Sequence, residues 1–223
     1  AGAAHPQAEG LAAWAAAAAS LRGDERTAAE LANRLEEALA RSSSAQDASG
    51  LHYMKAVIAF GRGRLEDARR LGLKSRQLFA GEDGTLAFVL AAHCAVLLGD
   101  RDALRRDAQP WDDRWGAWME RSGRTIAAAS LALEGRTEEA VAAYRKVLDE
   151  WRAADLPFDL ALALLERARL LGAADAEAAA GRDEAQAIFV AIGADGLLER
   201  IESGAGDTDL PIRSDGRGGT AVA

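Results

Sequence analysis

Residues 126–171, IAAASLALEGRTEEAVAAYRKVLDEWRAADLPFDLALALLERARLL, decide the fold of this chain. An apolar run precedes Gly135-Arg136, a second run ends near Trp151, and a third follows Pro157. Glycine permits the left-handed conformation that often ends a helix, and proline fits the first turn of a helix. The stretch therefore predicts a helical hairpin followed by the first helix of another.

Glycines recur along the chain at a similar spacing. They lie between amphipathic runs and are 40, 36, 36 and 37 residues apart, at Gly23, Gly63, Gly99, Gly135 and Gly172. A fixed period in this range is typical of stacked helical repeats. We therefore expect an all-α fold, a right-handed superhelical array of about five helix pairs.

Small residues accompany these glycines at two fixed offsets. Seven residues before them lie Ala16, Ala56, Ala92, Ala128 and Leu165. Five residues after them lie Ala28, Ala68, Leu104, Ala140 and Glu177. Because helices approach closely where the contacting side chains are small, we expect tight pairing in the first, second and fourth units.

Glycine, proline and polar residues also predict the boundaries of the domain and of its helices. We expect a flexible N-terminus over 1–9, a repeat domain over 10–202, and a disordered Gly-, Asp- and Ser-rich tail over 203–223. Within the domain, Asp24 should cap the second helix. The segments 41–50 and 81–84 should be loops, and Pro110 should end a short helix over 103–108.

Composition excludes several classes of protein. The net charge of −8 argues against a nucleic-acid or anionic-membrane surface. Cys94 is the single cysteine, so no intrachain disulfide forms, and we expect a cytoplasmic protein. The apolar run 11–21 is too short to span a membrane and lacks the basic segment of a signal peptide. Because the chain begins Ala1-Gly2 rather than with Met, we expect a processed or excised piece of a longer protein.

Motifs that carry chemistry were not found in the sequence. It contains neither a phosphate-binding Gly-x-x-x-x-Gly-Lys-Ser/Thr segment nor a Gly-x-Ser-x-Gly elbow. His93 and Cys94 are adjacent on a predicted helix and point about 100° apart, which makes a poor chelating pair. Acidic pairs such as Glu138-Glu139 begin helices, where the helix dipole favours them. We therefore expect no enzyme activity, no cofactor and no metal.

Three tryptophans are the clearest candidate for a binding feature. Trp111, Trp115 and Trp118 fall at i, i+4 and i+7, so a helix would place them on one face. Two interpretations stay open. They could fill the joint after the short helix, or they could form an exposed binding patch, because Trp is enriched at interface hot spots.

Around the central glycine, the sequence resembles the tetratricopeptide repeat. The matching positions are Ala128, Gly135, Ala140, Tyr144 and Val147-Leu148; the Trp and Leu-Gly positions of that repeat are not matched, and the period exceeds about 34 residues. The resemblance implies a concave surface formed by the first helix of each pair. By position it would present Tyr53, Phe60, His93, Thr125, Glu166 and Arg169. For each of these residues, ordinary packing or a solvated face is the alternative.

A narrower resemblance covers 132–140, 151–165 and 183–200. These segments are similar to the C-terminal helical-repeat region of bacterial signalling proteins with a STAND-type AAA ATPase and a nucleotide cyclase or helix-turn-helix module. This implies a non-enzymatic protein-interaction and regulatory module that binds a protein, a peptide or other domains of its own full-length chain. The alternative is a sensor that binds a small molecule near Tyr53, Phe60 and His93.

Overall fold

The computed structural model describes residues 6–40, 42–107, 116–172 and 174–203. In these ranges the chain forms eleven helices and no strand, which confirms the prediction of an all-α fold. None of the described helices is long and apolar enough to cross a membrane. The helices are α1 (Pro6–Leu21), α2 (Glu25–Leu39), α3 (Ala45–Gly61), α4 (Leu65–Leu78), α5 (Glu82–Leu98), α6 (Arg101–Asp107), α7 (Gly116–Leu133), α8 (Thr137–Ala153), α9 (Pro157–Leu171), α10 (Ala176–Ala191) and α11 (Leu197–Ser203).

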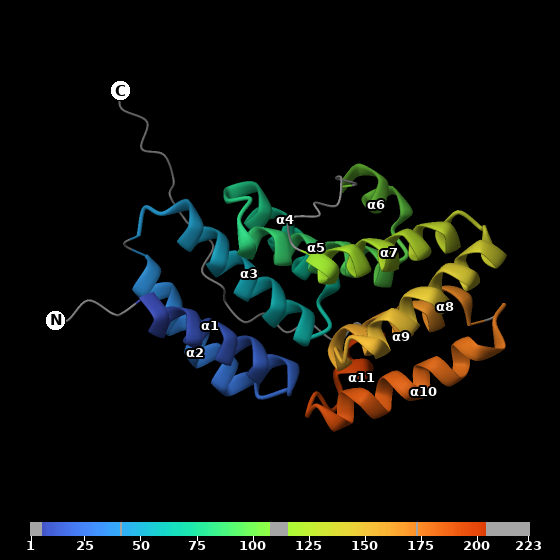
Figure 1. Cartoon of the computed structure of the whole chain (residues 1–223). Coiled ribbons are helices and arrows are strands. Elements are labelled where there is room, and N and C mark those ends of the chain that lie inside the picture. Colours follow the sequence, from blue (N-terminus) through green and yellow to red (C-terminus); the bar gives the residue numbers. More distant parts are fainter. Residues whose placement is uncertain (1–5, 41, 108–115, 173, 204–223) are drawn as a thin grey trace.

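Most neighbouring helices pack as pairs joined by short turns (Figure 1). The pairs are α1 with α2, α3 with α4, α7 with α8, and α9 with α10. The first helices of successive units, α1, α3, α5, α7 and α9, also pack against one another in that order. These helices therefore form a continuous inner layer that connects the two ends of the molecule.

The third unit departs from this pairing, because α5 packs more extensively on α4 than on α6. α6 has only 7 residues, so it covers little of the long apolar α5. Gly72 lets α4 approach α5 closely, since a Cβ at this position would lie 2.5 Å from the carbonyl oxygen of Ala87. Leu104 lies five residues after Gly99, where the first, second and fourth units have alanine and where close pairing was not expected. Its side chain is half-buried.

Four of the five repeat glycines end their turns in the left-handed region. The φ angles are 79° at Gly23, 75° at Gly63, 69° at Gly99 and 78° at Gly135, which an L side chain adopts only with strain. Gly172 differs, because its φ of −56° is helical and its N–H bonds to the carbonyl of Ala168. The fifth turn is therefore not equivalent to the other four, although its sequence spacing is.

Two predicted loops are partly helical, because acidic and serine residues begin helices there. Within 41–50, α3 begins at Ala45, and the Ser44 hydroxyl caps it by accepting a hydrogen bond from the Asp47 N–H. Within 81–84, α5 begins at Glu82, where Glu82 and Asp83 complement the helix dipole. The predicted cap of α2 is confirmed, since Asp24 Oδ1 accepts from the Thr27 N–H at 3.1 Å.

The ends of the domain also differ from the prediction. α1 begins at Pro6, so residues 6–9 are helical rather than part of a flexible N-terminus. α11 includes Ser203, and residues 204–223 lie outside the described residues, as does Pro110.

The interior is aliphatic and rich in alanine. The alanines at the two predicted close-approach offsets are buried in the first, second and fourth units: Ala16, Ala28, Ala56, Ala68, Ala128 and Ala140. Trp151, Tyr144, Phe60 and Phe189 are the largest side chains enclosed among them. The small residues at the crossings and a few large aromatic residues between the units together fill the core.

The last helix returns to the start of the chain. α11 packs on α3, and the Arg200 guanidinium donates to the carbonyl oxygens of Gly61 at 2.5 Å and Leu21 at 2.8 Å. Those carbonyls end α3 and α1, where backbone oxygens have no partner within the helix. The C-terminal unit is thereby tied to the first two pairs.

Candidate binding hollow

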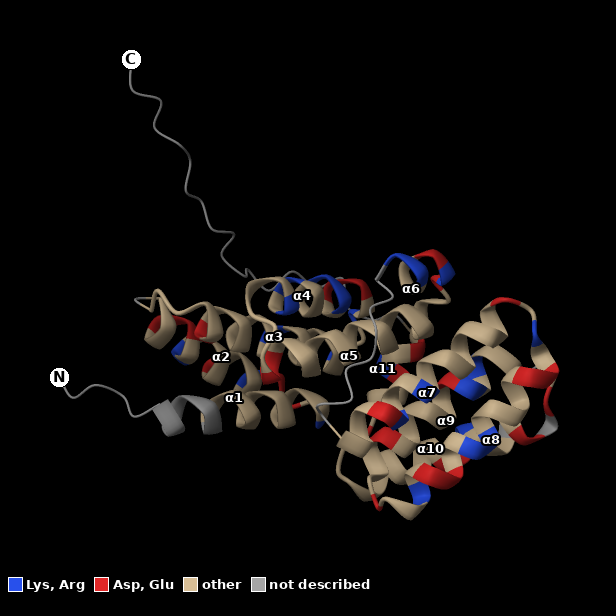
Figure 2. Cartoon of the chain, turned by 45° about the horizontal axis from the view of Figure 1, so that its top comes forward, with Lys and Arg blue, Asp and Glu red and all other residues tan. Residues whose placement is uncertain are grey.

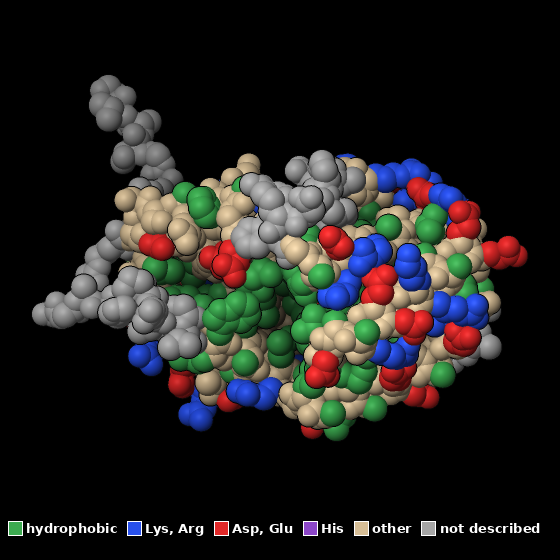
Figure 3. All heavy atoms as spheres, viewed as in Figure 1, with side chains coloured by type: hydrophobic (Ala, Val, Ile, Leu, Met, Phe, Trp, Pro, Cys, Tyr) green, Lys and Arg blue, Asp and Glu red, His purple; other side chains and the backbone are tan. Residues whose placement is uncertain are grey.

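A hollow lined by hydrophobic side chains lies over α3, between α1 and the half of the molecule that contains α7 and α9 (Figure 3). Where α1 meets α3, the rings of Trp14 and Tyr53 lie with centroids 5.9 Å apart in an edge-to-face arrangement. Trp14 is 56% exposed, which is unusual for so large an apolar ring. The inner layer of helices therefore presents aromatic surface to solvent at this place.

A row of three phenylalanines connects α3 to the C-terminal pair. Phe158 of α9 lies between Phe60 of α3 and Phe189 of α10, with centroid distances of 6.5 Å and 6.1 Å. Phe60 and Phe189 are buried, and Phe158 is half-buried. Edge-to-face stacking of this kind adds about 0.5–1.5 kcal/mol per pair to the burial of the rings. The row fixes the position of the α9 N-terminus beside α3.

Carboxylates surround the Tyr53 phenol. Burial raises the pKa of Tyr53 far above its usual value, and the charges of Asp83, Asp159 and Glu82 raise it further. Asp83 fits beside α3 because Gly50 has no side chain, and a Cβ there would lie 3.1 Å from Asp83 Oδ2. Burial, followed by the neighbouring Glu82, also raises the pKa of Asp83.

Asp159 connects these acids to α7. Its Oδ1 accepts a hydrogen bond of 2.9 Å from Trp118 Nε1. Burial raises the pKa of Asp159, and the Trp118 hydrogen bond together with the nearby His93 offsets part of that rise. Trp118 is half-buried, so of the predicted tryptophan face one member contacts the hollow, while Trp111 and Trp115 lie outside the described residues.

His93 and Glu166 form a buried polar pair next to Asp159. His93 Nδ1 lies 2.6 Å from Glu166 Oε1, and the side chains are 8% and 0% exposed. Burial opposes the charge on His93, but the carboxylates of Glu166 and Asp159 raise its pKa overall. Glu166 Oε2 and the Tyr144 hydroxyl are buried without a hydrogen-bond partner among the described residues.

The other residues expected on the concave surface have different environments. Thr125 is buried, and its Oγ1 accepts a hydrogen bond of 3.0 Å from Trp151 Nε1. Arg169 is exposed on α9. The structure thus brings Tyr53 and Trp118 to the hollow, packs Phe60 behind it, buries His93 with Glu166, and uses Thr125 between α7 and α8.

Sequence reasoning missed four residues of the hollow: Trp14, Asp83, Phe158 and Asp159. Asp83 and Asp159 lie in the first turns of their helices, where the helix dipole alone accounts for an acid. Trp14 lies in an alanine-rich run with no aromatic neighbour in sequence. One signal was available, because Pro157 begins α9 and places Phe158 and Asp159 at the inner end of that helix.

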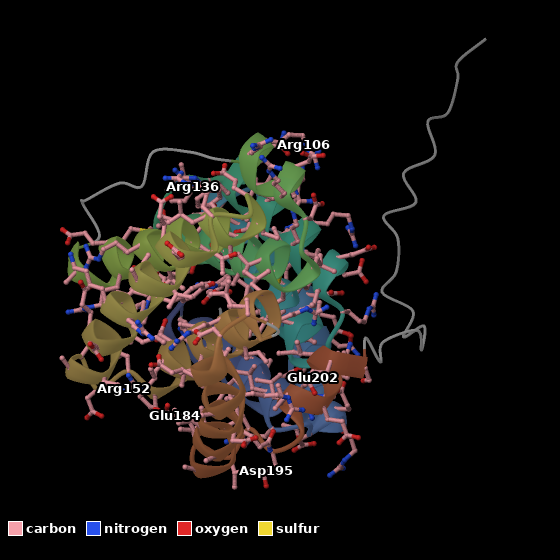
Figure 4. The ribbon with its side chains drawn as sticks, turned by 90° about the vertical axis from the view of Figure 1, so that its right-hand side faces the viewer. Arg106, Arg136, Arg152, Glu184, Asp195 and Glu202 are labelled. Atoms are coloured by element: carbon pink, nitrogen blue, oxygen red, sulfur yellow. The ribbon has the colours of Figure 1, made fainter. Side chains whose placement is uncertain are left out.

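Some charged residues elsewhere on the described surface form ion pairs between helices. Arg145 and Arg152 of α8 each bind a glutamate of α10, at 2.9 Å from Glu177 and from Glu184. Figure 4 labels the second pair, Arg152 and Glu184. Hydrogen bonds from Arg145 and Arg167 lower the pKa of Glu177 to about 2. Lys and Arg gather instead along α4 and α6 (Figure 2). One of them, Arg76 of α4, donates to Thr85 Oγ1 at 3.1 Å in the first turn of α5.

Two further features are weaker candidates. A broad, open groove of about 1120 Å³ runs over α4 and is lined by both acids and bases, among them Glu66, Asp67, Arg70 and Lys74. Across the described ranges, no group of three or more His, Cys, Asp or Glu side chains could hold a metal ion. Cys94 is fully buried, and that burial raises the pKa of its thiol.

Comparison with known proteins adds no assignment: no family model matches the chain, and no match was found among the curated proteins or the solved structures.

Proposed function

We propose that this chain is a non-enzymatic protein-interaction and regulatory module, built as a right-handed superhelical array of tetratricopeptide-like helix pairs. The observation that carries the proposal is the hollow, to which α1, α3, α7 and α9 all contribute aromatic rings. The serial packing of α1, α3, α5, α7 and α9 supports the array, because neighbouring units of an array stack on one another; α11 packs in addition on α3, outside that series. Contiguous exposed apolar surface of this kind marks sites of protein interaction.

The number of helices around the hollow favours a macromolecular partner. Trp14 lies on α1, Tyr53 on α3, Phe158 on α9 and Trp118 on α7. An extended peptide can place successive side chains against several of these rings, whereas a typical metabolite contacts fewer of them.

In the full-length protein, the partner is another protein or another domain of the same chain. We place the module in the C-terminal sensor or scaffold region of a cytoplasmic, multidomain ATPase-type transcriptional or cyclase regulator. The segment resemblance over 132–200 supports this placement. Occupation of the hollow would then change which surfaces of the module are free to hold the rest of that protein.

A small-molecule sensor is the second candidate function. The His93–Glu166 pair favours it, because the unpaired Glu166 Oε2 offers a buried acceptor near Asp159. An effector that reached this pair would need a hydrogen-bond donor and a mostly apolar body.

Thermal-shift screening separates the two candidates. Pools of random peptides should raise the unfolding midpoint of the chain, and a panel of small metabolites should not, because only the longer ligand contacts several helices. Peptides should no longer raise the unfolding midpoint of the Tyr53→Ala variant. They should still raise that of Val190→Ala, a control that shortens an exposed apolar side chain of α10. Stabilisation by metabolites alone would favour the sensor, and stabilisation by neither would contradict both functions.

A further inference from the structure

The acids of the hollow have no lysine or arginine partner in the described ranges, and His93 lies near one of them, Asp159. Asp83, Glu82 and Asp159 form no ion pair with any Lys or Arg of the described ranges; Asp159 instead accepts from the neutral Trp118 indole. By contrast, α8 and α10 are linked by arginine–glutamate pairs, and Arg182 binds Glu202 at 2.6 Å. Because carboxylates in a partly desolvated site are costly without a counter-charge, this arrangement is complementary to a cation from outside.

The aromatic rings beside these acids suit the same charge. A Lys or Arg side chain is attracted to the face of an aromatic ring and can lay its aliphatic part along apolar surface. Tyr53 lies beside Trp14, and the charges of Asp83, Asp159 and Glu82 act on its phenol, so a cation at this ring would also be attracted by the acids. The half-buried Phe158 lies close by on α9, where an apolar neighbour of that cation could pack.

We propose that the hollow binds a basic, hydrophobic peptide segment, with a Lys or Arg side chain held by Tyr53, Asp83 and Asp159 and an adjacent apolar side chain against Phe158. The inference rests on the proposed function and specifies the chemistry of the partner. Charge complementarity of this kind also steers the approach of a basic partner toward a chain whose net charge is −8.

The first arm of the test selects the ligand. A library of random eight-residue peptides displayed on phage is panned against the whole chain. Bound sequences should be enriched in Lys or Arg next to Leu, Ile, Phe or Trp. Enrichment of neutral or acidic sequences would overturn the proposed chemistry of the partner.

The second arm measures one selected peptide by fluorescence anisotropy. The Asp83→Asn/Asp159→Asn variant should weaken binding at least about ten-fold, because charge-assisted contacts are lost while the side-chain shapes remain. Replacing the peptide's basic residue by Met should weaken binding to the wild-type chain by a similar factor. Added salt should weaken the wild-type complex more than the variant complex.

A matched control separates local from general electrostatics. Glu37→Gln/Glu138→Gln removes the same net charge from exposed positions on α2 and α8, and this variant should bind like the wild type. Far-UV circular dichroism and thermal unfolding confirm that each variant is folded. Equal affinity for the hollow variant and the wild type would overturn the inference.

The outcomes also distinguish the inference from the proposed function. Peptide binding that is abolished by Tyr53→Ala but unchanged by Asp83→Asn/Asp159→Asn would support the interaction module. The same result would refute the proposal that the partner is basic. If no peptide binds the chain, both proposals fail.

Discussion

Arg200 of α11 donates a hydrogen bond from Nε to the carbonyl oxygen of Gly61, which lies 139 residues earlier at the end of α3. The same guanidinium reaches Leu21 at the end of α1. An arginine suits these positions, because the last carbonyls of a helix lack internal partners and carry the negative end of its dipole. α11 is thereby held against the C-terminal ends of α1 and α3.

Gly63→Ala should test this connection. Its φ is 75°, and an added Cβ would lie 2.1 Å from the carbonyl oxygen of Arg200, so α11 would have to move. We expect the free energy of unfolding, measured in urea, to fall by at least about 1 kcal/mol more than it does for Gly135→Ala. Gly135 has a φ of 78° but nothing within 4 Å of the added Cβ, so that variant reports backbone strain alone.

The comparison of Gly63→Ala with Gly135→Ala has one outcome that would contradict the prediction. If the two glycine variants lose equal stability, the contact between α11 and α3 is absent in solution. The C-terminal unit would then be free of the first two pairs.

Ala140→Leu should destabilise the fourth unit. Ala140 of α8 is fully buried, as is Ala128 of α7, so three added carbons would overpack the contact between these helices. Overpacking costs about 1–3 kcal/mol. The urea midpoint should fall for Ala140→Leu and stay nearly constant for Ala142→Leu, because Ala142 is exposed. Equal midpoints, or a larger loss at Ala142, would mean that the register of the helix pair is wrong.

The fold could be predicted from the sequence where local chemistry decides it. Gly23, Gly63, Gly99 and Gly135 adopt the left-handed conformation that only glycine tolerates easily, and Pro157 begins α9. Helix starts were less predictable, because Ser44 can end a loop or cap a helix. Gly172 lies between α9 and α10 as its spacing predicted, but spacing does not reveal that its conformation is helical.

The hollow was harder to predict, because it depends on contacts between distant segments. Trp118 meets Asp159 across 41 residues, and His93 meets Glu166 across 73. The resemblance assigned Tyr53 and His93 to the first helices of their pairs, but position in a repeat does not separate an open site from one that a later helix covers. Arg200 gave no local signal, because its partners end helices far away in sequence.

His93 should make stability depend on pH. Its pKa in the folded chain lies above the usual 6.5, so its contribution is complete below 6.5 and is lost as the pH rises through the raised value. Thermal midpoints measured from about pH 6 to about pH 9 should therefore fall more steeply for the wild type than for His93→Gln. His52→Gln, which changes a half-buried histidine bonded to the Ala48 carbonyl, should follow the wild type. Parallel curves for the wild type and His93→Gln would show that the pair with Glu166 does not form.

Asp159→Asn should stabilise the chain at neutral pH. Burial raises the pKa of Asp159 above 3.8, so the folded state loses stability as the pH rises from 3.8 through the raised value. Asparagine removes that penalty and can still accept the Trp118 hydrogen bond. The thermal midpoint should rise at about pH 7, and the gain should shrink toward about pH 4. A lower midpoint at neutral pH would mean that the carboxylate already has a cationic partner within the chain; Glu37→Gln, at an exposed site, controls for net charge.

The most direct test of the interaction site is a nuclear magnetic resonance titration of the ¹⁵N-labelled chain with a selected basic peptide. The indole N–H signals, assigned by single Trp→Phe changes, report separate places: Trp14 and Trp118 at the hollow, and Trp151 buried against Thr125. We predict saturable shifts of the Trp14 and Trp118 signals while the Trp151 signal stays in place. Binding that shifts Trp151, or that leaves both Trp14 and Trp118 unmoved, would contradict the assignment of the hollow as the site of interaction.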